Sequence, residues 1–230
     1  MSRRLTTLNA QSCPIEQVTH LLPALTQAQM HPTVIQKHLA HTHTASLYLG
    51  DIDHQISTHT SAYTKAAVLI PLIARQNSMT VLLTQRAHHL YDHPGQISFP
   101  GGKHTNQDSN ATDTALRETH EEIGLAAKQI TVLGIMPKYI TITGYCITPV
   151  IGLITPPFTL TPDPSEVTEV FEVPFDFLMN PAHHQHRYIQ TDQEKRYFYA
   201  ITYPQTEVNN YFIWGATAGL IRNLYLLLAS

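Results

Sequence analysis

Residues 117–125 read Arg-Glu-Thr-His-Glu-Glu-Ile-Gly-Leu, and this nonapeptide constrains the fold more than any other segment. Glu121 and Glu122 follow Glu118 by three and four residues, and such spacings share one face of a helix. Carboxylates gathered on one face repel each other unless a cation lies between them. The segment therefore predicts a helix that holds a hard divalent cation.

The flanking residues predict where this helix begins and ends. Asn110 is a good N-cap residue, and Asp113 stands where a reciprocal capping acid is found. Gly124 supplies a left-handed stop, so the predicted helix covers residues 111–123. Upstream, residues 99–102 read Phe-Pro-Gly-Gly, which indicates a tight backbone turn that only glycine tolerates easily.

Helical phase predicts two separate faces on this helix. Glu118 and Glu122 fall on one side with Glu121 beside them, while small and apolar side chains fall on another side. The residues expected to pack on the protein are Thr112, Leu116, Thr119 and Ile123. We expect the packing face and the acidic face not to compete.

An oxygen-ligand Mg²⁺ or Mn²⁺ site is the function that the acidic face favours. Mg²⁺ prefers carboxylates, water and substrate phosphates over a closed protein cage, which suits phosphate chemistry. We expect Glu118 and Glu122 to bind the metal and Glu121 to act as a further ligand or as the base. Arg117 is expected to orient Glu118 through a bidentate contact. The alternative is a solvated acidic face, which the glycine turn and the helix cap disfavour.

Residues 102–125 resemble a Nudix box, the signature of hydrolases that cleave a nucleoside diphosphate linked to another group. The first half departs from the family pattern, because Asp108 stands where the family has a glutamate and eight residues rather than seven separate it from Arg117. A one-residue insertion there is typical of the coenzyme A pyrophosphatase branch. The second half matches residue for residue, at Arg117, Glu118, Glu121, Glu122, Gly124 and Leu125.

The sequence before the box also resembles that branch. Residues 82–86 read Leu-Leu-Thr-Gln-Arg, and Gly95 and residues 99–102 follow as in the branch signature. Two positions depart: Ala87 replaces a serine, and Tyr91 replaces an arginine that a phosphate could meet. Later segments that resemble the branch are residues 142–145, 148–150, 166–174 and 213–219.

The resemblance implies a fold and three competing functions. The fold is an α/β/α sandwich with a mixed β-sheet, of the α+β class. The first function is Mg²⁺- or Mn²⁺-dependent hydrolysis of coenzyme A or its thioesters to 3′,5′-ADP and 4′-phosphopantetheine or its acyl form. The second is hydrolysis of another nucleoside diphosphate derivative, such as ADP-ribose, NADH or a dinucleotide, which Tyr91 favours. The third is a non-catalytic nucleotide-binding module, which the complete glutamate set disfavours.

Several residues outside the helix are candidates for contact with the substrate. The candidates for binding its phosphates are the cations Arg86, Lys103 and Arg222, and Gly101 and Gly102 are further candidates for binding the substrate. For each of the three cations, a role as an ordinary surface residue is an equal alternative. Glu166 precedes a predicted strand, where an active-site loop can supply an extra ligand or base, and a solvated turn acid is its alternative.

Fifteen histidines invite a second metal site, but their distribution does not favour one. A borderline metal needs convergent ligands with supporting hydrogen bonds, and we expect structural or surface roles for the histidines of residues 38–59 and 183–186. His88, His89 and His93 are the exception. They lie in the loop that leads to the glycine turn, from which they could touch a phosphate or a base.

Composition limits the remaining functions. A net charge of −3 provides no basic field for nucleic acid or an anionic membrane. Cys13 and Cys146 are too few for a disulfide framework or a zinc site, and Cys146 is expected to be a small buried hydrophobe. No signal peptide or bilayer-spanning apolar run is indicated, so we expect a cytoplasmic protein that acts on a small molecule.

Hydrophobic patterning predicts an extension, residues 1–65, followed by a Nudix domain, residues 66–230. The extension is expected to contain helices at residues 14–28 and 32–40. Its role is expected to be either capping the core or mediating a homodimer. In the domain, residues 66–75 and 79–86 predict a hairpin. Further predicted strands are residues 97–99, 130–136, 146–153, 167–173 and 196–203, and further predicted helices are residues 175–179 and 213–228.

Overall fold

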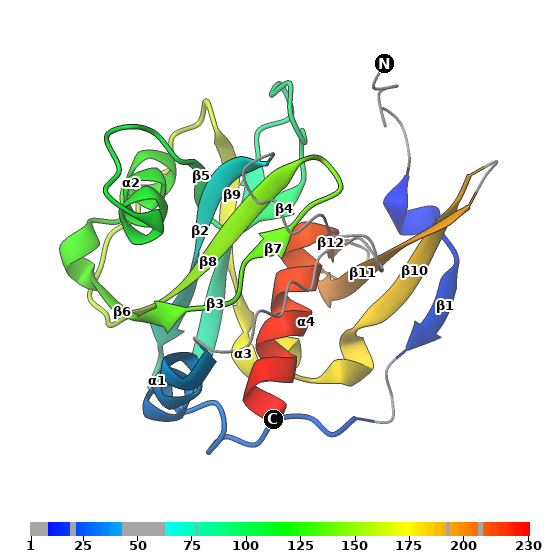
Figure 1. The fold of residues 1–230 in the computed structure, drawn as a ribbon, viewed down its shortest axis with the longest axis horizontal. Coiled ribbons are helices and arrows are strands. Elements are labelled where there is room, and N and C mark those ends of the chain that lie inside the picture. The colour runs from blue at the N-terminus through cyan, green and yellow to red at the C-terminus, as the bar shows by residue number, and fades with distance from the viewer. Residues whose placement is uncertain (1–8, 19–21, 43–62, 77, 192–193, 207–208) are drawn as a thin grey trace.

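A computed structural model of the chain describes residues 9–18, 22–42, 63–76, 78–191, 194–206 and 209–230. Within these residues the chain forms two β-sheets, with helices outside and between them (Figure 1).

The larger sheet is mixed, as the sequence predicts. Its main path has the order β4-β3-β2-β8-β6, in which β2 and β8 are parallel and the other pairs are antiparallel. Three further strands attach to this path, since β5 pairs with β2, β7 with β8 and β9 with β3. The strands are β2 (Thr64–Ala74), β3 (Met79–Arg86), β4 (Ile97–Ser98), β5 (Gly101–Lys103), β6 (Ile130–Ile135), β7 (Tyr139–Ile140), β8 (Tyr145–Ile154) and β9 (Val167–Pro174).

Apolar side chains on both faces of β2 explain why helices cover both faces of this sheet. Leu69 packs in one core with Ile123 of α2 (Ala111–Ile123), whereas its neighbour Ile70 lies in the larger core with Leu224 of α4 (Ala216–Ala229). Successive residues of a strand point to opposite faces, so one apolar run supplies both cores. The layers α2, sheet and α4 confirm the predicted α/β/α sandwich (Figure 1).

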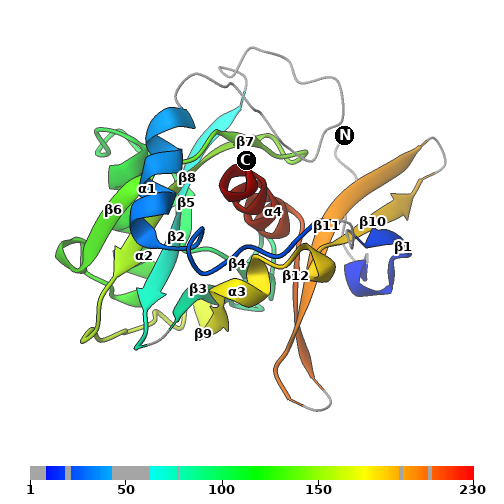
Figure 2. The same ribbon diagram turned by 90° about the horizontal axis from the view of Figure 1, so that it is seen from below.

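A second sheet, antiparallel throughout, lies beyond α4, and only its third strand was expected (Figure 2). Ile201 and Ile213 from this sheet enter the core that contains α4, so α4 is buried between two sheets. The strands, in their order across the sheet, are β1 (Ile15–Val18), β10 (Gln185–Gln190), β11 (Lys195–Pro204) and β12 (Asn210–Trp214).

Two helix predictions need correction in the region of this sheet. Residues 14–28 do not form the predicted helix where they are described, because Ile15–Val18 finds a strand partner in β10, far away in the sequence. The predicted helix at residues 213–228 begins later, at Ala216. Gly215, with a φ of 61°, separates the end of β12 from the first turn of α4.

The other predicted helices are confirmed. α1 (Pro32–His41) packs on β6, where Leu39 occupies the space beside Gly134, and α3 (Phe175–Leu178) is a single short helix. Cys146 is buried, as expected. No helix in the described part of the chain is long and apolar enough to cross a membrane. The division of the chain at residue 65 and the homodimer stay predictions. Short 3₁₀ turns occur at η1 (Ala10–Ser12), η4 (Ala127–Gln129) and η5 (Pro181–His183).

Candidate active site

Helix α2 has the ends that the sequence predicts. The side chain of Asn110 accepts a hydrogen bond from the backbone N–H of Asp113 at 3.0 Å. The carboxylate of Asp113 accepts in return from the backbone N–H of Ser109 at 3.2 Å. Gly124 closes the helix in the left-handed conformation, with φ of 72°. These caps fix the rotation of the helix and therefore the directions of its glutamates.

The predicted separation of a packing face from an acidic face is wrong for one glutamate. Glu122 is only 2% exposed, and it lies on the buried side of α2 with Ala115 and Thr119. The physical reason is helical phase, since Glu122 follows Thr119 by three residues and Ala115 by seven, and these spacings share one face of a helix. Glu121 points outward, and its side chain is 53% exposed. The sheet therefore encloses one carboxylate and leaves another in solvent.

The glycine pair before the helix lies directly against its carboxylates. The backbone N–H of Gly101 donates to Oε2 of Glu122 at 3.3 Å. A Cβ atom at Gly102 would overlap the carboxylate of Glu118, and one at Gly101 would overlap the backbone of β2. Glycine is thus required at Gly101 by its contact with backbone, and a side chain at Gly102 would displace the carboxylate of Glu118. This close approach brings β5 alongside Glu118 and Glu122.

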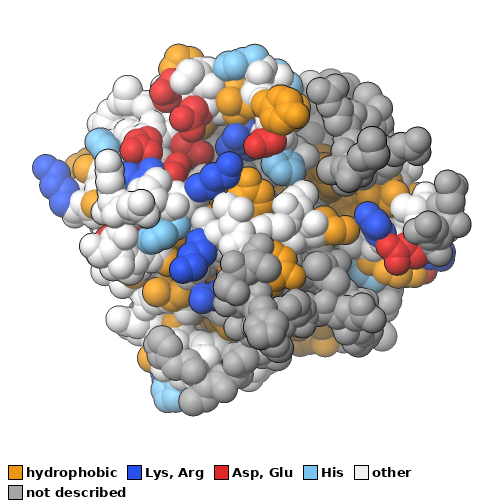
Figure 3. Space-filling model, turned by 45° about the horizontal axis from the view of Figure 1, so that its top comes forward, with side chains coloured by type: hydrophobic (Ala, Val, Ile, Leu, Met, Phe, Trp, Pro, Cys, Tyr) orange, Lys and Arg blue, Asp and Glu red, His pale blue; other side chains and the backbone are white. Residues whose placement is uncertain are grey.

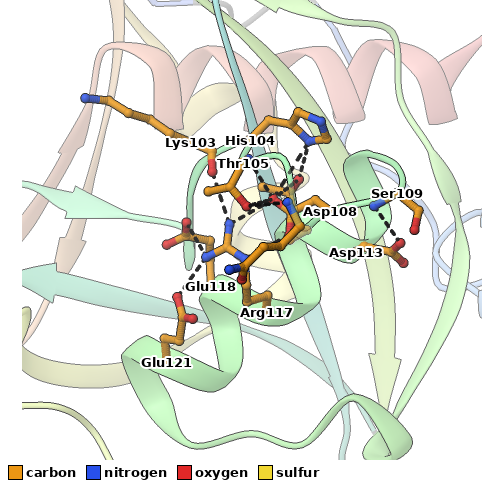
Figure 4. Close-up of polar contacts among 12 residues, drawn as sticks. Lys103, His104, Thr105, Asp108, Ser109, Asp113, Arg117, Glu118 and Glu121 are labelled. Carbon is orange, nitrogen blue, oxygen red and sulfur yellow. Dashed lines mark hydrogen bonds and ion pairs between the residues drawn. The ribbon is translucent and has the colours of Figure 1, made fainter.

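Arg117 connects the glutamates to the preceding loop, but not in the predicted way. Its bidentate contact is with Asp108, at 2.8 Å from Nε and 3.0 Å from Nη2, rather than with Glu118. Its Nη1 donates to both Glu118 and Glu121 at 2.8 Å, as Figure 4 shows. Arg117 therefore positions two carboxylates from a guanidinium that Asp108 holds in place.

Asp108 is a site residue that sequence reasoning noted but did not select. It is buried, and it accepts hydrogen bonds from Thr105 and Thr114 in addition to Arg117. Arg117 and these hydrogen bonds hold the pKa of Asp108 well below its usual range. The available signal was its position, six residues after Gly102.

The remaining carboxylates lack enough positive charge from the protein. Burial raises the pKa of Glu122 to about 8, although Arg86 lowers it. Burial also raises the pKa of Glu118 despite its contact with Arg117. The charge of Glu166 contributes to both shifts, so Glu166 lies close to both glutamates. Three mutually repelling carboxylates, one of them buried, are the surroundings in which a cation is stabilising.

A divalent cation with oxygen ligands fits these residues. Glu118 and Glu122 would hold it, with Glu166 next to them. Among the described residues, no group of three or more His, Cys, Asp or Glu side chains is arranged so that it could hold a metal ion. A cation here would therefore depend on the two glutamates together with water and substrate oxygens, which Mg²⁺ commonly keeps in its coordination sphere.

Arg86 and Glu166 approach the site from neighbouring strands. Nη1 of Arg86 lies 3.8 Å from Oε1 of Glu122. The backbone N–H of Ala87 donates to the carbonyl of Glu166 at 2.8 Å, so the end of β3 fixes the residue that precedes β9. The structure thus brings Arg86, Gly101, Gly102 and Glu166 together with the glutamates of α2.

Two other predicted phosphate contacts lie differently. Lys103 meets the network only through its carbonyl, which accepts from Arg117 at 3.1 Å, while its side chain extends away (Figure 4). Arg222 is only 7% exposed, and its guanidinium lies 5.3 Å from the ring centre of Tyr225 and 5.7 Å from that of Tyr199. The structure supports neither a phosphate contact nor a surface position for Arg222.

The histidines have local structural roles where their contacts are defined. His88 packs on Gly95, where a Cβ atom would overlap the imidazole ring. His183 and His184 donate to the carbonyls of Phe177 and Leu178 at 2.9 and 2.7 Å. For His88, His89 and His93, no hydrogen bond to the glutamates is found within the described residues, so a substrate contact stays a prediction.

Figure 3 views the face on which acidic side chains gather, with lysine, arginine and histidine side chains next to them. Both signs of charge therefore meet on one face of a chain whose net charge is only −3. A metal and an anionic substrate can be attracted to adjacent positions on such a face.

Comparison with known proteins agrees with this arrangement. The NUDIX domain model matches residues 63–194. The uncharacterized Nudix hydrolase NudL of Escherichia coli (strain K12) is 39% identical over 176 residues, covering 75% of this chain and 86% of that protein. NudL of Enterobacter sp. (strain 638) is 37% identical over 162 residues, covering 70% and 81%. The solved Nudix hydrolase RenU of M. smegmatis is 27% identical, covering 50% of this chain and 72% of that chain, with a TM-score of 0.43. The domain match and the two relatives show that the chain belongs to the Nudix hydrolase family.

Proposed function

We propose that this enzyme is a divalent-metal-dependent diphosphatase that cleaves coenzyme A or its thioesters to 3′,5′-ADP and 4′-phosphopantetheine or its acyl form. The observation that carries the diphosphatase part is the buried carboxylate of Glu122, which shares its surroundings with Glu118 and Glu166. A buried carboxylate whose pKa is about 8 is unfavourable as an anion until a cation joins it.

Glu118 and Glu122 are the proposed ligands of Mg²⁺ or Mn²⁺. When bound, such an ion neutralises phosphate oxygens and makes phosphorus more electrophilic. Arg117 and Asp108 keep Glu118 in place, and the backbone N–H of Gly101 does the same for Glu122. The protein thus supplies a preorganised set of oxygen atoms, and the substrate is expected to complete it through its diphosphate.

Glu166 is the stronger candidate for the base that accepts a proton from the attacking water. Glu121 already forms an ion pair with Arg117 at 2.8 Å, and its side chain is 53% exposed. The carboxylate of Glu166 accepts no hydrogen bond from the described residues, and it lies near both proposed metal ligands. The water oxygen then bonds to phosphorus, the diphosphate P–O bond breaks, and the leaving phosphate departs with its electron pair.

Coenzyme A as the substrate is supported by the sequence pattern before the Nudix box and by the insertion after Asp108. Tyr91 replaces the arginine of that pattern and is 86% exposed, so it can contact a ligand but cannot provide a cation. This replacement is the reason to keep ADP-ribose and NADH as a second substrate class.

A substrate panel tests the proposal. Turnover of coenzyme A, acetyl-coenzyme A, ADP-ribose, NADH and a nucleoside triphosphate is measured with Mg²⁺, with Mn²⁺ and with EDTA. We expect the highest kcat/KM for coenzyme A or its thioester and no turnover with EDTA. A preference for ADP-ribose or NADH contradicts the proposal that coenzyme A is the substrate. Binding without turnover of any of these compounds contradicts the proposal that the protein is a diphosphatase.

A further inference from the structure

Lys103 leaves its strand on the side opposite the active-site glutamates. The adjacent Gly102 faces Glu118 so closely that a Cβ atom there would overlap the carboxylate. Successive residues of a strand point to opposite faces, so the side chain of Lys103 points away from Glu118. Figure 4 shows this side chain extending away from Glu118 and Arg117.

The backbone of Lys103 is nevertheless firmly fixed. Lys103 pairs with Ala66 of β2, and its carbonyl accepts from Arg117 at 3.1 Å. Its ammonium lies 5.8 Å from the ring centre of Tyr145, within the range of a cation–π interaction. No carboxylate pairs with this ammonium in the described ranges. It is a positioned cation that has no counter-ion among the described residues.

Two further lysines add positive charge at this end of the sheet. Lys65 and Lys138 both act electrostatically on Cys146, and both are exposed. Lys65 pairs with Cys146 and therefore belongs to the other face of the sheet from Tyr145, which pairs with Thr64. Residues 63–76 and 126–154, which build this end of the sheet, contain no Asp or Glu. The excess positive charge here predicts an anionic ligand.

We propose that Lys103, held against Tyr145 at a positively charged end of the sheet, binds a phosphate monoester that the substrate carries outside the diphosphate being cleaved. In coenzyme A this group is the 3′-phosphate of the ribose. ADP-ribose and NADH lack such a phosphate, so the subsite selects among the candidate substrates. This inference rests on the proposed function and assigns its specificity to residues outside the metal site.

The test compares coenzyme A with dephospho-coenzyme A, which differs only in lacking the 3′-phosphate. For Lys103→Ala we expect kcat/KM to fall about tenfold with coenzyme A and less than about twofold with dephospho-coenzyme A, as the loss of one charge-assisted hydrogen bond requires. Inhibition by 3′,5′-ADP is expected to weaken about tenfold in the same variant, while inhibition by 5′-AMP stays within about twofold.

Matched variants test whether the effect of Lys103→Ala comes from misfolding or from the removal of any surface lysine. Lys128→Ala removes an exposed lysine from η4, and we expect wild-type values for both substrates. Tyr145→Phe keeps the ring and is expected to retain selectivity, whereas Tyr145→Leu is expected to lose part of it.

The outcomes separate this inference from the proposed function. Equal losses with coenzyme A and dephospho-coenzyme A in Lys103→Ala would overturn the subsite, because Lys103 would then act on the common diphosphate or on folding. A wild-type enzyme that cleaves both compounds equally well would also overturn it. A wild-type enzyme that cleaves neither compound refutes the coenzyme A proposal itself, and the subsite with it.

Discussion

Two buried charges, Glu122 at the active site and Arg222 beneath the second sheet, receive different treatment from the fold. Glu122 has one backbone N–H donor and an arginine at 3.8 Å, and it lies among other carboxylates. Arg222 lies near two aromatic rings, and its Nη1 donates to Nδ1 of His184 at 3.5 Å, while its Nε has no hydrogen-bond partner in the described part of the chain.

The difference separates a ligand site from a structural one. The aromatic rings of Tyr199 and Tyr225 and the imidazole of His184 accommodate Arg222 inside the core. Glu122 has like charges beside it, and only an added cation relieves them. We therefore expect the energetics of Glu122 to depend on metal, and those of Arg222 and His184 to depend on the protein alone.

Glu122→Gln tests this distinction most directly. The amide keeps the shape of the side chain but removes the charge that binds the cation, so turnover is expected to fall by roughly a thousandfold. Above pH 8, where the carboxylate of the metal-free wild type is ionised, the metal-free variant is expected to be at least as stable as the wild type, because a buried anion has been removed. Steady-state kinetics and urea unfolding measure the two effects.

The control for this variant is Glu172→Gln, which alters a glutamate of β9 paired with Arg75, the residue that follows β2. We expect its turnover to stay near that of the wild type. Undiminished activity of Glu122→Gln would remove the proposed metal site.

The pH dependence of the metal-free protein is the next largest effect. Folding raises the pKa of Glu122 from its ordinary 4.5 to about 8, so the folded chain holds this proton more tightly than the unfolded chain. The resulting stability is fully present below pH 4.5 and is lost as the pH rises through 8. The loss is on the order of 5 kcal/mol.

Mg²⁺ should offset this loss, so the rise in Tm that it causes is expected to be larger at pH 8.5 than at pH 6, on either side of the raised pKa of about 8. Thermal melts with Mg²⁺ and with EDTA measure it. An equal rise at both pH values, or an equal one in Glu122→Gln, contradicts the assignment of this titration to Glu122.

His184 gives the opposite pH dependence in the second region. Burial lowers its pKa from 6.5 to about 4, so the unfolded chain binds the proton more tightly. Stability is therefore fully present above pH 6.5 and is lost as the pH falls toward 4, by on the order of 3 kcal/mol. Urea unfolding at several pH values from about 7 down to about 4.5 measures this loss of stability.

His184→Gln is expected to flatten this dependence, and Mg²⁺ is expected not to change it. His38→Gln, which alters a partly exposed histidine of α1, is the matched control and should keep the wild-type slope. A slope in His184→Gln as steep as in the wild type would assign the acid sensitivity to other residues.

The two outer glutamates of the site are expected to differ in importance. Glu166→Gln removes the proposed base and should lower kcat by roughly a hundredfold, whereas Glu121→Gln, which loses an exposed ion pair, should lower it by about tenfold or less. Rate profiles against pH distinguish the roles, since only loss of the base removes the acidic limb. The reverse order of the two losses assigns the base to Glu121.

Asp108→Asn tests the buried charge that is fully paired, and we expect the smallest effect from it. The variant keeps a hydrogen bond to Arg117 but loses the charge, so the free energy of unfolding is expected to fall by about 2 kcal/mol. Chemical denaturation measures this change, and it should be the same with and without Mg²⁺. A larger fall in the presence of Mg²⁺ would place Asp108 in the metal site.

Local signals explain which parts of the fold the sequence predicts well. The bounds of α2 follow from Asn110 and Gly124, whose capping chemistry involves neighbouring residues only. The β2–β3 hairpin likewise follows from two apolar runs and a polar turn. β1 and β10 are missed because their strand character depends on pairing across more than 160 residues (Ile15 with Arg187), and their own sequences are polar and short.

The candidate site divides in the same way. Motif and spacing single out Glu118, Glu121, Glu122 and Arg117, since these lie within one helix. The partner of Arg117 is Asp108, and the neighbour of Glu118 and Glu122 is Glu166, and both depend on how loops return to the helix. The direction of Lys103 depends on the pairing of β5 with β2.

By itself the sequence determined the family, the acidic helix and the glycine turn, because capping, spacing and backbone freedom are properties of adjacent residues. Only the tertiary structure decided that Glu122 is buried while Glu121 is exposed, and that Arg222 belongs to the core. The physical reason is that burial and charge compensation depend on which segments meet in space. Residues far apart in the chain therefore set the pKa of Glu122 and the partner of Arg117.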